Sequence, residues 1–278
     1  MCYMVTNTVQ IRAVTLRSSR ISTGELAGVA RTSLSLDVAS LDVDIQNCDA
    51  RNMAGVVLYA HGDVKISGYK ISLSNFTVKE HVVSVSQIAY QHVAAADVVV
   101  DLVQIRAKWI VGLVVHVGKT LTASECQVTM RECDAAKSMH GLSYDVNDTT
   151  VVEGVGVSLD EINSKWINGI AHKLNAETTI TNSQITLSHF SCSDYINGVF
   201  LDAQSQLSFD NVTVQLSSGT GNHTNGVGEN IKGVTSFNKL SLTLHDVTAS
   251  WHVINFITYV NGPLTITDSV VVDKTVTA

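Results

Sequence analysis

Residues 179–216 read TITNSQITLSHFSCSDYINGVFLDAQSQLSFDNVTVQL. Near the start of this stretch Ile180, Ile185 and Leu187 alternate with polar residues, and the alternation returns at Leu207 and Val212. Between the two lies an apolar run that contains a glycine, at residues 195–201. Strict alternation over a few residues is typical of half-buried β-strands. The stretch therefore predicts a repeat unit made of three short strands.

Pairs of alternating runs like these recur along the whole chain. They lie at residues 9–16, 34–43, 64–73, 98–105, 121–130, 152–159, 242–249 and 264–272, in addition to the two already quoted. Their spacing of about 22 to 35 residues falls within the range of solenoid repeats, and the chain therefore predicts roughly ten rungs.

Most units also contain a glycine followed by an aliphatic residue, which we assign to the third strand. These glycines are Gly28, Gly55, Gly112, Gly141, Gly169, Gly198 and Gly233. Residues 217–230 are rich in Gly, Ser, Thr and Asn, and they predict an exposed loop. Helical character is confined to residues 134–139 and 160–166, and each of these segments is too short to be stable without packing.

Three short strands per unit can stack so that each strand pairs in parallel with its copy one rung away. We therefore predict an all-β fold, a right-handed parallel β-helix (β-solenoid) of roughly ten rungs with three strands per rung. In this register Ile180 lies over Leu207 and Ile185 lies over Val212. A leucine-rich repeat has an overlapping period but requires a regular Asn ladder that these units lack. Residues 1–278 then form a single β-helix domain, a segment of a longer chain or a subunit of a larger assembly.

The repeat pattern resembles, over nearly the full length, the right-handed β-helix repeats of secreted and surface proteins. Pectin-lyase-like proteins, autotransporter passengers and large protist surface proteins belong to this group. Many members cleave or bind polysaccharides, so the resemblance implies carbohydrate as a possible partner. It also implies a location outside the cell or on its surface.

The composition limits the partners. Hydrophobic residues make up 45% of the chain, which is enough to fill a large core, and only 15% of residues are charged. The formal net charge is -7, which disfavours nucleic acid as a partner. No apolar stretch approaches the roughly 20 residues of a membrane-spanning helix, so no transmembrane segment is expected. The first residues show neither the basic region nor the apolar core of a secretory signal.

Glycoside cleavage requires two carboxyl groups that act together, one as proton donor. The nearest approaches in the sequence are Asp42 with Asp44, Asp97 with Asp101, Asp145 with Asp148, and Asp160 with Glu161. None of them forms an adjacent-acid motif with a basic partner one rung away. Lyases of the resembling fold use Arg or Lys with bound calcium, and the basic residues of this chain are too dispersed to indicate such a site. We therefore expect no catalytic residues, no cofactor and no enzymatic activity.

Histidine and cysteine indicate no metal site or disulfide framework. His61, His116, His140 and His172 fall in or after third strands, but at different offsets from the repeat glycine, so we expect surface or strand-end positions and not metal ligands. Most cysteines fall on rungs too far apart for a disulfide. Cys126 with Cys133 is the one intramolecular pair that could bond.

Four Asn-x-Ser/Thr sequons occur, at Asn75, Asn147, Asn211 and Asn222. Asn147 and Asn222 are predicted to lie in loops and are the better candidates for N-glycosylation. Asn211 has to point outward from a strand. Glycosylation would fit an extracellular or cell-surface location.

The two ends of the predicted rod are apolar. The first rung presents Val9, Ile11, Val14 and Leu16, and the last presents Leu264, Ile266, Val270 and Val272. Such strand edges continue into further repeats of a longer chain or associate head-to-tail with another copy. The sequence thus favours a non-catalytic structural or adhesive β-solenoid of a cell surface or extracellular filament. The alternative is a carbohydrate-active β-helix protein that binds or cleaves polysaccharide.

Overall fold

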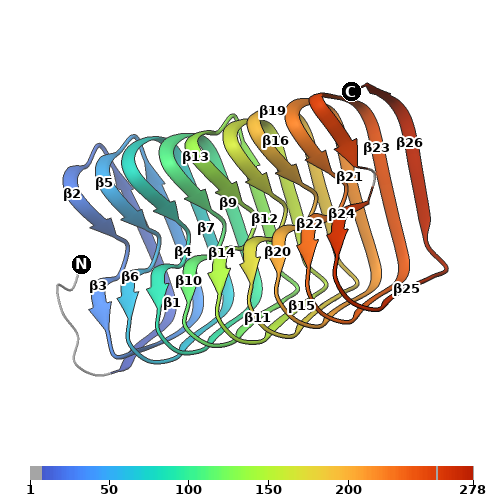
Figure 1. The fold of residues 1–278 in the computed structure, drawn as a ribbon. Helices are drawn as coiled ribbons and strands as arrows, with labels where there is room; N and C mark the ends of the chain where they lie inside the picture. The colour runs from blue at the N-terminus through green and yellow to red at the C-terminus, as the bar shows by residue number, and fades with distance from the viewer. Residues whose placement is uncertain (1–7, 255, 278) are drawn as a thin grey trace.

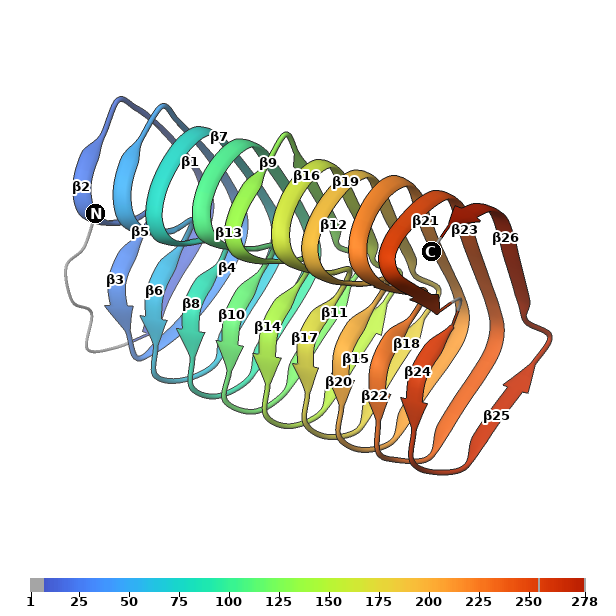
Figure 2. The same cartoon turned by 45° about the horizontal axis from the view of Figure 1, so that its top comes forward.

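The computed structural model describes residues 8–254 and 256–277, and every regular element within them is a β-strand (Figure 1). The chain winds into stacked coils that advance steadily from the N-terminus to the C-terminus (Figure 2). Strands of adjacent coils pair in parallel, as β1 with β4 and β21 with β23. In Figure 1 the short strands in front run downward and the chain returns upward behind them as it advances to the right, which is the right-handed sense that parallel crossovers nearly always take. The predicted parallel β-helix is confirmed.

The strands form two sheets. The short-strand sheet contains β3 (Ala30–Ser33), β6 (Val57–Ala60), β8 (Ser86–Ala89), β10 (Val114–Val117), β14 (Ser143–Val146), β17 (Ala171–Leu174), β20 (Phe200–Ala203), β22 (Gly228–Ile231) and β24 (Ile257–Val260). The long-strand sheet contains β1 (Thr8–Ser19), β2 (Ser22–Ala27), β4 (Ser35–Gln46), β5 (Asp49–Ala54), β7 (Val64–Val83), β9 (Val93–Val111), β11 (Leu121–Ser124), β12 (Gln127–Arg131), β13 (Asp134–His140), β15 (Thr150–Glu153), β16 (Gly156–Asn168), β18 (Thr178–Thr181), β19 (Gln184–Asn197), β21 (Leu207–Asn225), β23 (Thr235–Ile254), β25 (Leu264–Thr267) and β26 (Val270–Thr277).

Two corners in each coil divide the long-strand sheet into three faces. The first face lies before the first corner, the second face between the two corners, and the third face after the second corner. All residues with positive φ in the described chain lie at these corners, with φ between 46° and 62°. Each coil is numbered by its first corner. The first corners of coils 1 to 10 are, in order, Ala13, Ser40, Gly68, Asp97, Glu125, Gly154, Asn182, Asn211, Lys239 and Asp268. The second corners, each seven residues later, are Arg20, Asn47, Asn75, Gln104, Glu132, Glu161, His189, Ser218, Asp246 and Thr275. Most L-residues disfavour this conformation, so its recurrence shows that the stacking of the coils imposes the corner geometry.

The core is one continuous column of aliphatic and aromatic side chains inside the coils. The largest fully buried side chains include Tyr69, Phe76, Phe200, Phe209 and Phe237. At about 4.8 Å per coil, ten coils make a rod of roughly 50 Å. The predicted third strand, which begins at the repeat glycine, corresponds to the short strand, and the segment before that glycine adds a fourth extended segment to each rung.

The repeat glycines lie where the third face ends and the short-strand sheet begins. A side chain at Gly141 would overlap the carbonyl oxygen of Gly169 in the next coil, and one at Gly169 would overlap the carbonyl oxygen of Gly198. The coils therefore approach too closely there for a Cβ atom. Gly233 is not in this column: Gly226 occupies the position in coil 8, and Ser84 occupies it in coil 3.

Several details of the predicted register are wrong. Ile180 pairs with Phe209, and Ile185 pairs with Val214, two residues beyond the predicted partners. Coil 7 is 29 residues long, whereas the prediction aligned the repeats at 27. Because the shift is even, the same side chains still point into the core.

The segments that were predicted as helix or loop are strands. Residues 134–139 and 160–166 belong to β13 and β16, and residues 217–230 continue through β21 into β22. In residues 160–166 and 217–230 the alternation is broken at the second corners, Glu161 and Ser218. In residues 134–139 it is broken by a β-bulge, where the pairing register shifts between Ala135 and Ser138. An extra residue on one strand interrupts a period of two, so the pattern no longer resembles a strand.

At the N-terminal end Ile11, Val14 and Leu16 align with buried core residues of coil 2, and the backbone of Val9 pairs with Leu36. At the C-terminal end the prediction is corrected. Leu264 and Ile266 align with the core, with 41% and 49% exposure, as expected.

Val270 and Val272, however, pair with Ser241 and Thr243 on the outer surface. The inward positions of that strand belong to Ser269, Val271 and Asp273, because the αL corner at residue 268 sets the register. The last coil is thus less apolar on its inner side than the sequence suggested.

Candidate functional site

The acid pairs considered from the sequence lie on outer surfaces, and three of the pairs contain a carboxylate held by a partner in a neighbouring coil, namely Asp101, Asp145 and Asp160. Asp101 forms an ion pair of 3.5 Å with Arg131. Asp160 accepts a hydrogen bond of 2.7 Å from the Ser188 hydroxyl and lies 2.8 Å from His189 Nδ1, and these contacts lower the pKa of Asp160. The proton donor of a glycosidase needs the opposite shift. Asp42 and Asp44 point outward from one strand, β4.

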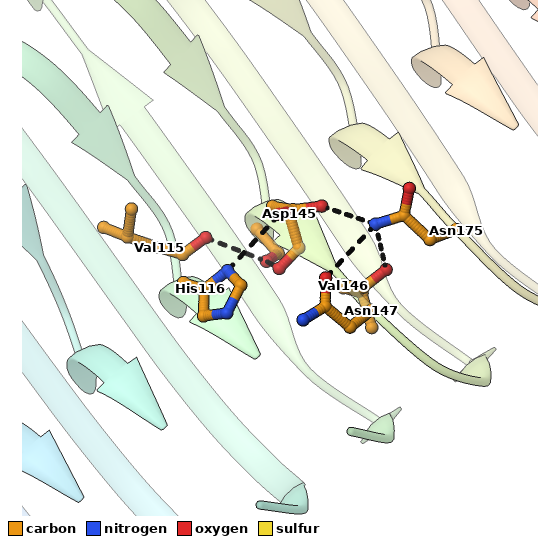
Figure 3. Close-up of polar contacts among 7 residues, drawn as sticks. Val115, His116, Asp145, Val146, Asn147 and Asn175 are labelled. Atoms are coloured by element: carbon orange, nitrogen blue, oxygen red, sulfur yellow. Dashed lines mark hydrogen bonds and ion pairs between the residues drawn. The ribbon is translucent and has the colours of Figure 1, made fainter. Parts of the chain in front are cut away.

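Asp145 lies on the outer surface of the short-strand sheet, within a network that links three coils (Figure 3). Its Oδ2 is 3.3 Å from His116 Nδ1, and its Oδ1 accepts a hydrogen bond of 2.8 Å from Asn175 Nδ2. Asp148 instead accepts a hydrogen bond of 2.9 Å from the backbone N–H of Thr149. Asp145 and Asp148 are thus held by different partners.

A row of five basic residues runs along the third face through coils 2 to 6. This basic row consists of Arg51, Lys79, Lys108, Lys137 and Lys165. The spacings along the sequence are 28, 29, 29 and 28 residues, which are coil lengths, so successive members lie in adjacent coils about 4.8 Å apart in rise. From the sequence, the basic residues were expected to be dispersed. The signal that could have found the row is the spacing of 28 or 29 residues between its members, which equals the coil length.

An extra residue in alternate coils shapes this face. Coils 3, 5, 7 and 9 have one residue more than coils 4, 6 and 8 between the second corner and the end of the third face. The pairing register shifts at this place, for example between Thr77 and His81. The resulting bulge in coil 3 presents Glu80, whose Oε2 lies 2.9 Å from Lys108 Nζ in coil 4.

Beside the basic row lies an aromatic row. It consists of His81, Trp109, Trp166, Tyr195 and His223 from the third face, with Tyr144 and His172 from the short-strand sheet. Rings from the two sheets touch: the Trp109 and Tyr144 centroids are 4.9 Å apart, and those of Trp166 and His172 are 5.4 Å apart. These contacts place the aromatic row where the two sheets meet.

The two rows also contact each other. Lys137 Nζ lies 5.5 Å from the centroid of the Trp109 ring, and Lys165 Nζ lies 5.1 Å from that of Trp166. Both are cation–π distances. The rows therefore form one continuous surface in which the basic side chains lie beside the aromatic rings.

Several buried polar atoms of this surface have no hydrogen-bond partner in the protein. They are Asn52 Oδ1 and His81 Nδ1 from the third face, Gln87 Oε1 from β8, and His172 Nδ1 from β17. Burial lowers the pKa of His81 and of His172, so both rings favour the neutral form. An unpaired buried polar atom costs about 1–3 kcal/mol.

A buried polar ladder lies directly behind the aromatic row. Asn197 Nδ2 donates to Asn168 Oδ1, and Asn225 Nδ2 donates to Asn197 Oδ1, both at 2.8 Å. Asn168 Nδ2 lies 3.2 Å from His140 Nδ1. Because the amide donates, His140 Nδ1 must accept, and the ring is held neutral. Burial and the nearby His172 lower the pKa of His140 well below its ordinary value.

Sequence reasoning missed this ladder. It expected surface or strand-end positions for His140 and His172; His140 does end β13, but both side chains are buried. The four coils before His140 have Ala27, Ala54, Val83 and Val111 in the same column. The recurrence of Asn before Gly at residues 168, 197 and 225 is the signal that could have found the ladder.

Two adjoining hollows border the basic row on the side of the second corner. The larger, of about 590 Å³, is lined by residues of coils 3 to 5 that include Lys79, Arg106, Lys108 and Lys137. The other, of about 490 Å³, shares Thr77 and Arg106 with it. Both are open depressions of the surface and not enclosed cavities.

The cysteines in the described part of the chain do not reach this surface. Cys48, Cys126, Cys133 and Cys192 are buried free thiols. Cys126 and Cys133 each follow a different corner of coil 5, and they do not bond to one another. Within the described ranges, no group of three or more His, Cys, Asp or Glu side chains is arranged to hold a metal ion.

The four sequons lie on the outside of the rod. Asn75 and Asn211 are exposed at corners, and Asn147 is exposed in the turn after β14. Asn222 is not in a loop. It lies within β21, and its side-chain amide donates a hydrogen bond of 2.6 Å to the Ser193 carbonyl.

No family model, curated protein or solved structure matches this chain. In the part of the chain that the structure describes, no helix has the length and apolarity needed to span a bilayer. The surface itself must therefore carry any functional conclusion.

Proposed function

We propose that this protein is a non-catalytic adhesive β-solenoid that binds an extended carbohydrate chain along its third face. The observation that carries the proposal is the surface formed by the basic row and the aromatic row, which repeats coil by coil for several coils. A linear polymer with a regular repeat is the kind of ligand that such a surface fits. A small molecule would instead favour one enclosed pocket.

Carbohydrate suits the chemistry of this surface. Sugar rings present C–H groups to aromatic rings and hydroxyl groups to polar side chains. The aromatic row supplies the rings, and the ammonium and guanidinium groups of the basic row supply hydrogen-bond donors. Trp251, which is 73% exposed in coil 9 near His223, extends the aromatic surface toward the C-terminal end.

Binding without cleavage is proposed because three of the four predicted pairs contain a carboxylate, Asp101, Asp145 or Asp160, that is held by a partner in a neighbouring coil. The test is to incubate the protein with a panel of neutral and acidic polysaccharides and to measure both retention and reducing ends. Retention that is lost in a Trp109→Ala, Trp166→Ala double variant, without release of reducing ends, supports the proposal. Failure to retain any polysaccharide refutes it.

A second candidate function is hydrolysis of the bound chain, and one observation favours it. Burial and the nearby carboxylates of Asp202 and Asp194 raise the pKa of Glu229, as a proton donor requires. Asp194 also accepts a hydrogen bond of 2.8 Å from Trp166 Nε1, which places it beside the aromatic row. Reducing ends released by the wild type and abolished in Glu229→Gln would establish hydrolysis and replace the non-catalytic proposal.

We also propose that the end coils associate, either with further coils of a longer chain or with a second copy. Ile266 and Val271 are 49% and 47% exposed, and Val14 at the other end is 37% exposed. An Ile266→Lys, Val271→Lys double variant should reduce the mass measured by light scattering if copies stack head-to-tail. An unchanged monomeric mass in the wild type at high concentration refutes stacking between copies. Exposed sequons fit an extracellular or cell-surface location, which we propose on that basis.

A further inference from the structure

We infer that the ligand is a linear anionic glycan, whose carboxylate or sulfate groups are held by the basic row and Arg106 while its chain runs parallel to the rod axis. This inference rests on the proposed function and adds the chemical class and direction of the ligand. It is carried by the arrangement of charges in coils 2 to 6.

Most of these cations are not neutralised by the protein. Lys108 pairs with Glu80 at 2.9 Å, and Lys165 approaches Asp194 at 3.8 Å. Arg51, Lys79, Arg106 and Lys137 are exposed, and none of them forms an ion pair among the described residues. The net charge of the whole chain is -7, so a row of unpaired cations makes this part of the surface positive on a protein that is negative as a whole.

The bulges provide a place for an anionic group. Coil 4 lacks the extra residue that coils 3 and 5 carry, so it is recessed between two bulges, and the hollow of about 590 Å³ lies there. Lys79 enters the hollow from coil 3, Arg106 from coil 4 and Lys137 from coil 5. The carboxylate of Asp134 also lines the hollow, and it accepts a hydrogen bond of 3.4 Å from Asn163 Nδ2. Three free cations thus face one carboxylate.

The guanidinium of Arg106 offers paired N–H donors, which match the oxygens of a carboxylate or a sulfate. The lysines supply charge without demanding one geometry, so they tolerate a ligand whose groups are spaced only approximately like the coils. Trp109, under Lys137, lies at the edge of the same region and can contact a sugar ring. An anionic sugar chain satisfies both kinds of side chain.

A nucleic acid fits this row less well. The phosphates of each strand of duplex DNA advance by about 3.4 Å and wind around the helix, whereas the basic row is straight and advances by about 4.8 Å per coil. The acidic residues elsewhere on the chain would repel a long polyphosphate. A linear glycan with one anionic group per sugar can follow a straight row.

The experiment measures binding by calorimetry for four probes: a heparin oligosaccharide, an oligouronate of similar length, a neutral oligosaccharide of similar length, and single-stranded DNA of similar charge. The heparin and oligouronate arms distinguish a sulfated glycan from one that carries carboxylates alone. We expect at least one of the two anionic glycans to bind more tightly than the neutral one, and its affinity to fall as salt rises. Arg106→Gln and Lys79→Gln should each weaken that binding, by about tenfold for a lost charge-assisted contact.

Lys70→Gln is the matched control, because Lys70 is exposed in the same coil as Lys79 but on the second face. It should leave binding unchanged. An equal loss in Lys70→Gln, or DNA binding at least as tight as the best glycan, overturns the inference. Equal affinity for the anionic and the neutral glycans overturns it too, but leaves the proposed function standing. Absence of binding to every glycan refutes the proposed function itself.

Discussion

Replacement of Asn197 by alanine tests whether the buried ladder stabilises the middle coils. The Asn197 side chain is fully buried and makes one hydrogen bond to each neighbouring coil, donating to Asn168 Oδ1 and accepting from Asn225 Nδ2, both at 2.8 Å. Asn197→Ala removes both bonds and leaves two buried polar atoms without partners. At about 1–3 kcal/mol for each unsatisfied atom, the free energy of unfolding should fall by roughly 2–6 kcal/mol.

Asn238→Ala is the control, because Asn238 makes the same kind of ladder on the exposed first face. Its Nδ2 donates to Asp210 Oδ1 at 2.7 Å, and its Oδ1 accepts from the Thr267 hydroxyl at 3.0 Å. Water can replace these partners, so the expected loss is only about 0.5 kcal/mol.

The assay for both variants is urea denaturation together with native-state hydrogen exchange. Exchange reports the coils separately, which matters because solenoids need not unfold in one step. Amides of coils 6 to 8 should lose protection in Asn197→Ala and keep it in Asn238→Ala. Equal losses in the two variants would show that burial of the ladder is not what makes it stabilising.

Three further predictions follow from the interior. Gly169→Ala places a methyl group against the Gly198 carbonyl and should lower the free energy of unfolding by about 1–3 kcal/mol or more, measured by thermal denaturation. Gly24→Ala is the control and should be nearly neutral, because nothing lies within 4 Å of the new Cβ atom. The pKa of His140 is lower in the folded than in the unfolded chain, so the unfolded state binds a proton first as the pH falls. The free energy of unfolding should therefore decrease by up to about 1.4 kcal/mol per pH unit below about pH 6.5. His140→Asn keeps an acceptor for the ladder and should reduce that slope in denaturation series at several pH values; an unchanged slope would contradict the assignment. Burial raises the pKa of the Cys192 thiol to about 12, so iodoacetamide should label it only after unfolding, and rapid labelling of the native protein would be the opposing result.

The general fold could be predicted because its cause is local. Ile185 and Leu187 alternate with polar residues, and an alternating strand has one side that must be buried. Repetition of such strands leaves stacking as the way to bury them all. The register could not be obtained in the same way, since a shift of two residues keeps Ile185 in the core whether Val212 or Val214 lies beside it. Only the corners at residues 182 and 211 decide between these two partners.

The candidate surface was hidden for a related reason. Lys79, Lys108 and Lys137 are separated by nearly thirty residues each, and a lysine outside any local motif normally indicates only a solvated surface. Their alignment depends on the length of every coil between them. One residue more or less in a turn would move a lysine out of the row.

The sequence by itself determined that this chain is a parallel β-helix, because alternation and repetition are properties of neighbouring residues. The tertiary structure decided which residues of different coils meet. It placed the Asn ladder behind the aromatic rings, turned Val270 and Val272 outward, and gathered the basic row on one face. The physical reason is that contacts between coils depend on an exact count of residues around each turn, and that count is set by corners and bulges whose conformations form only when the coils stack.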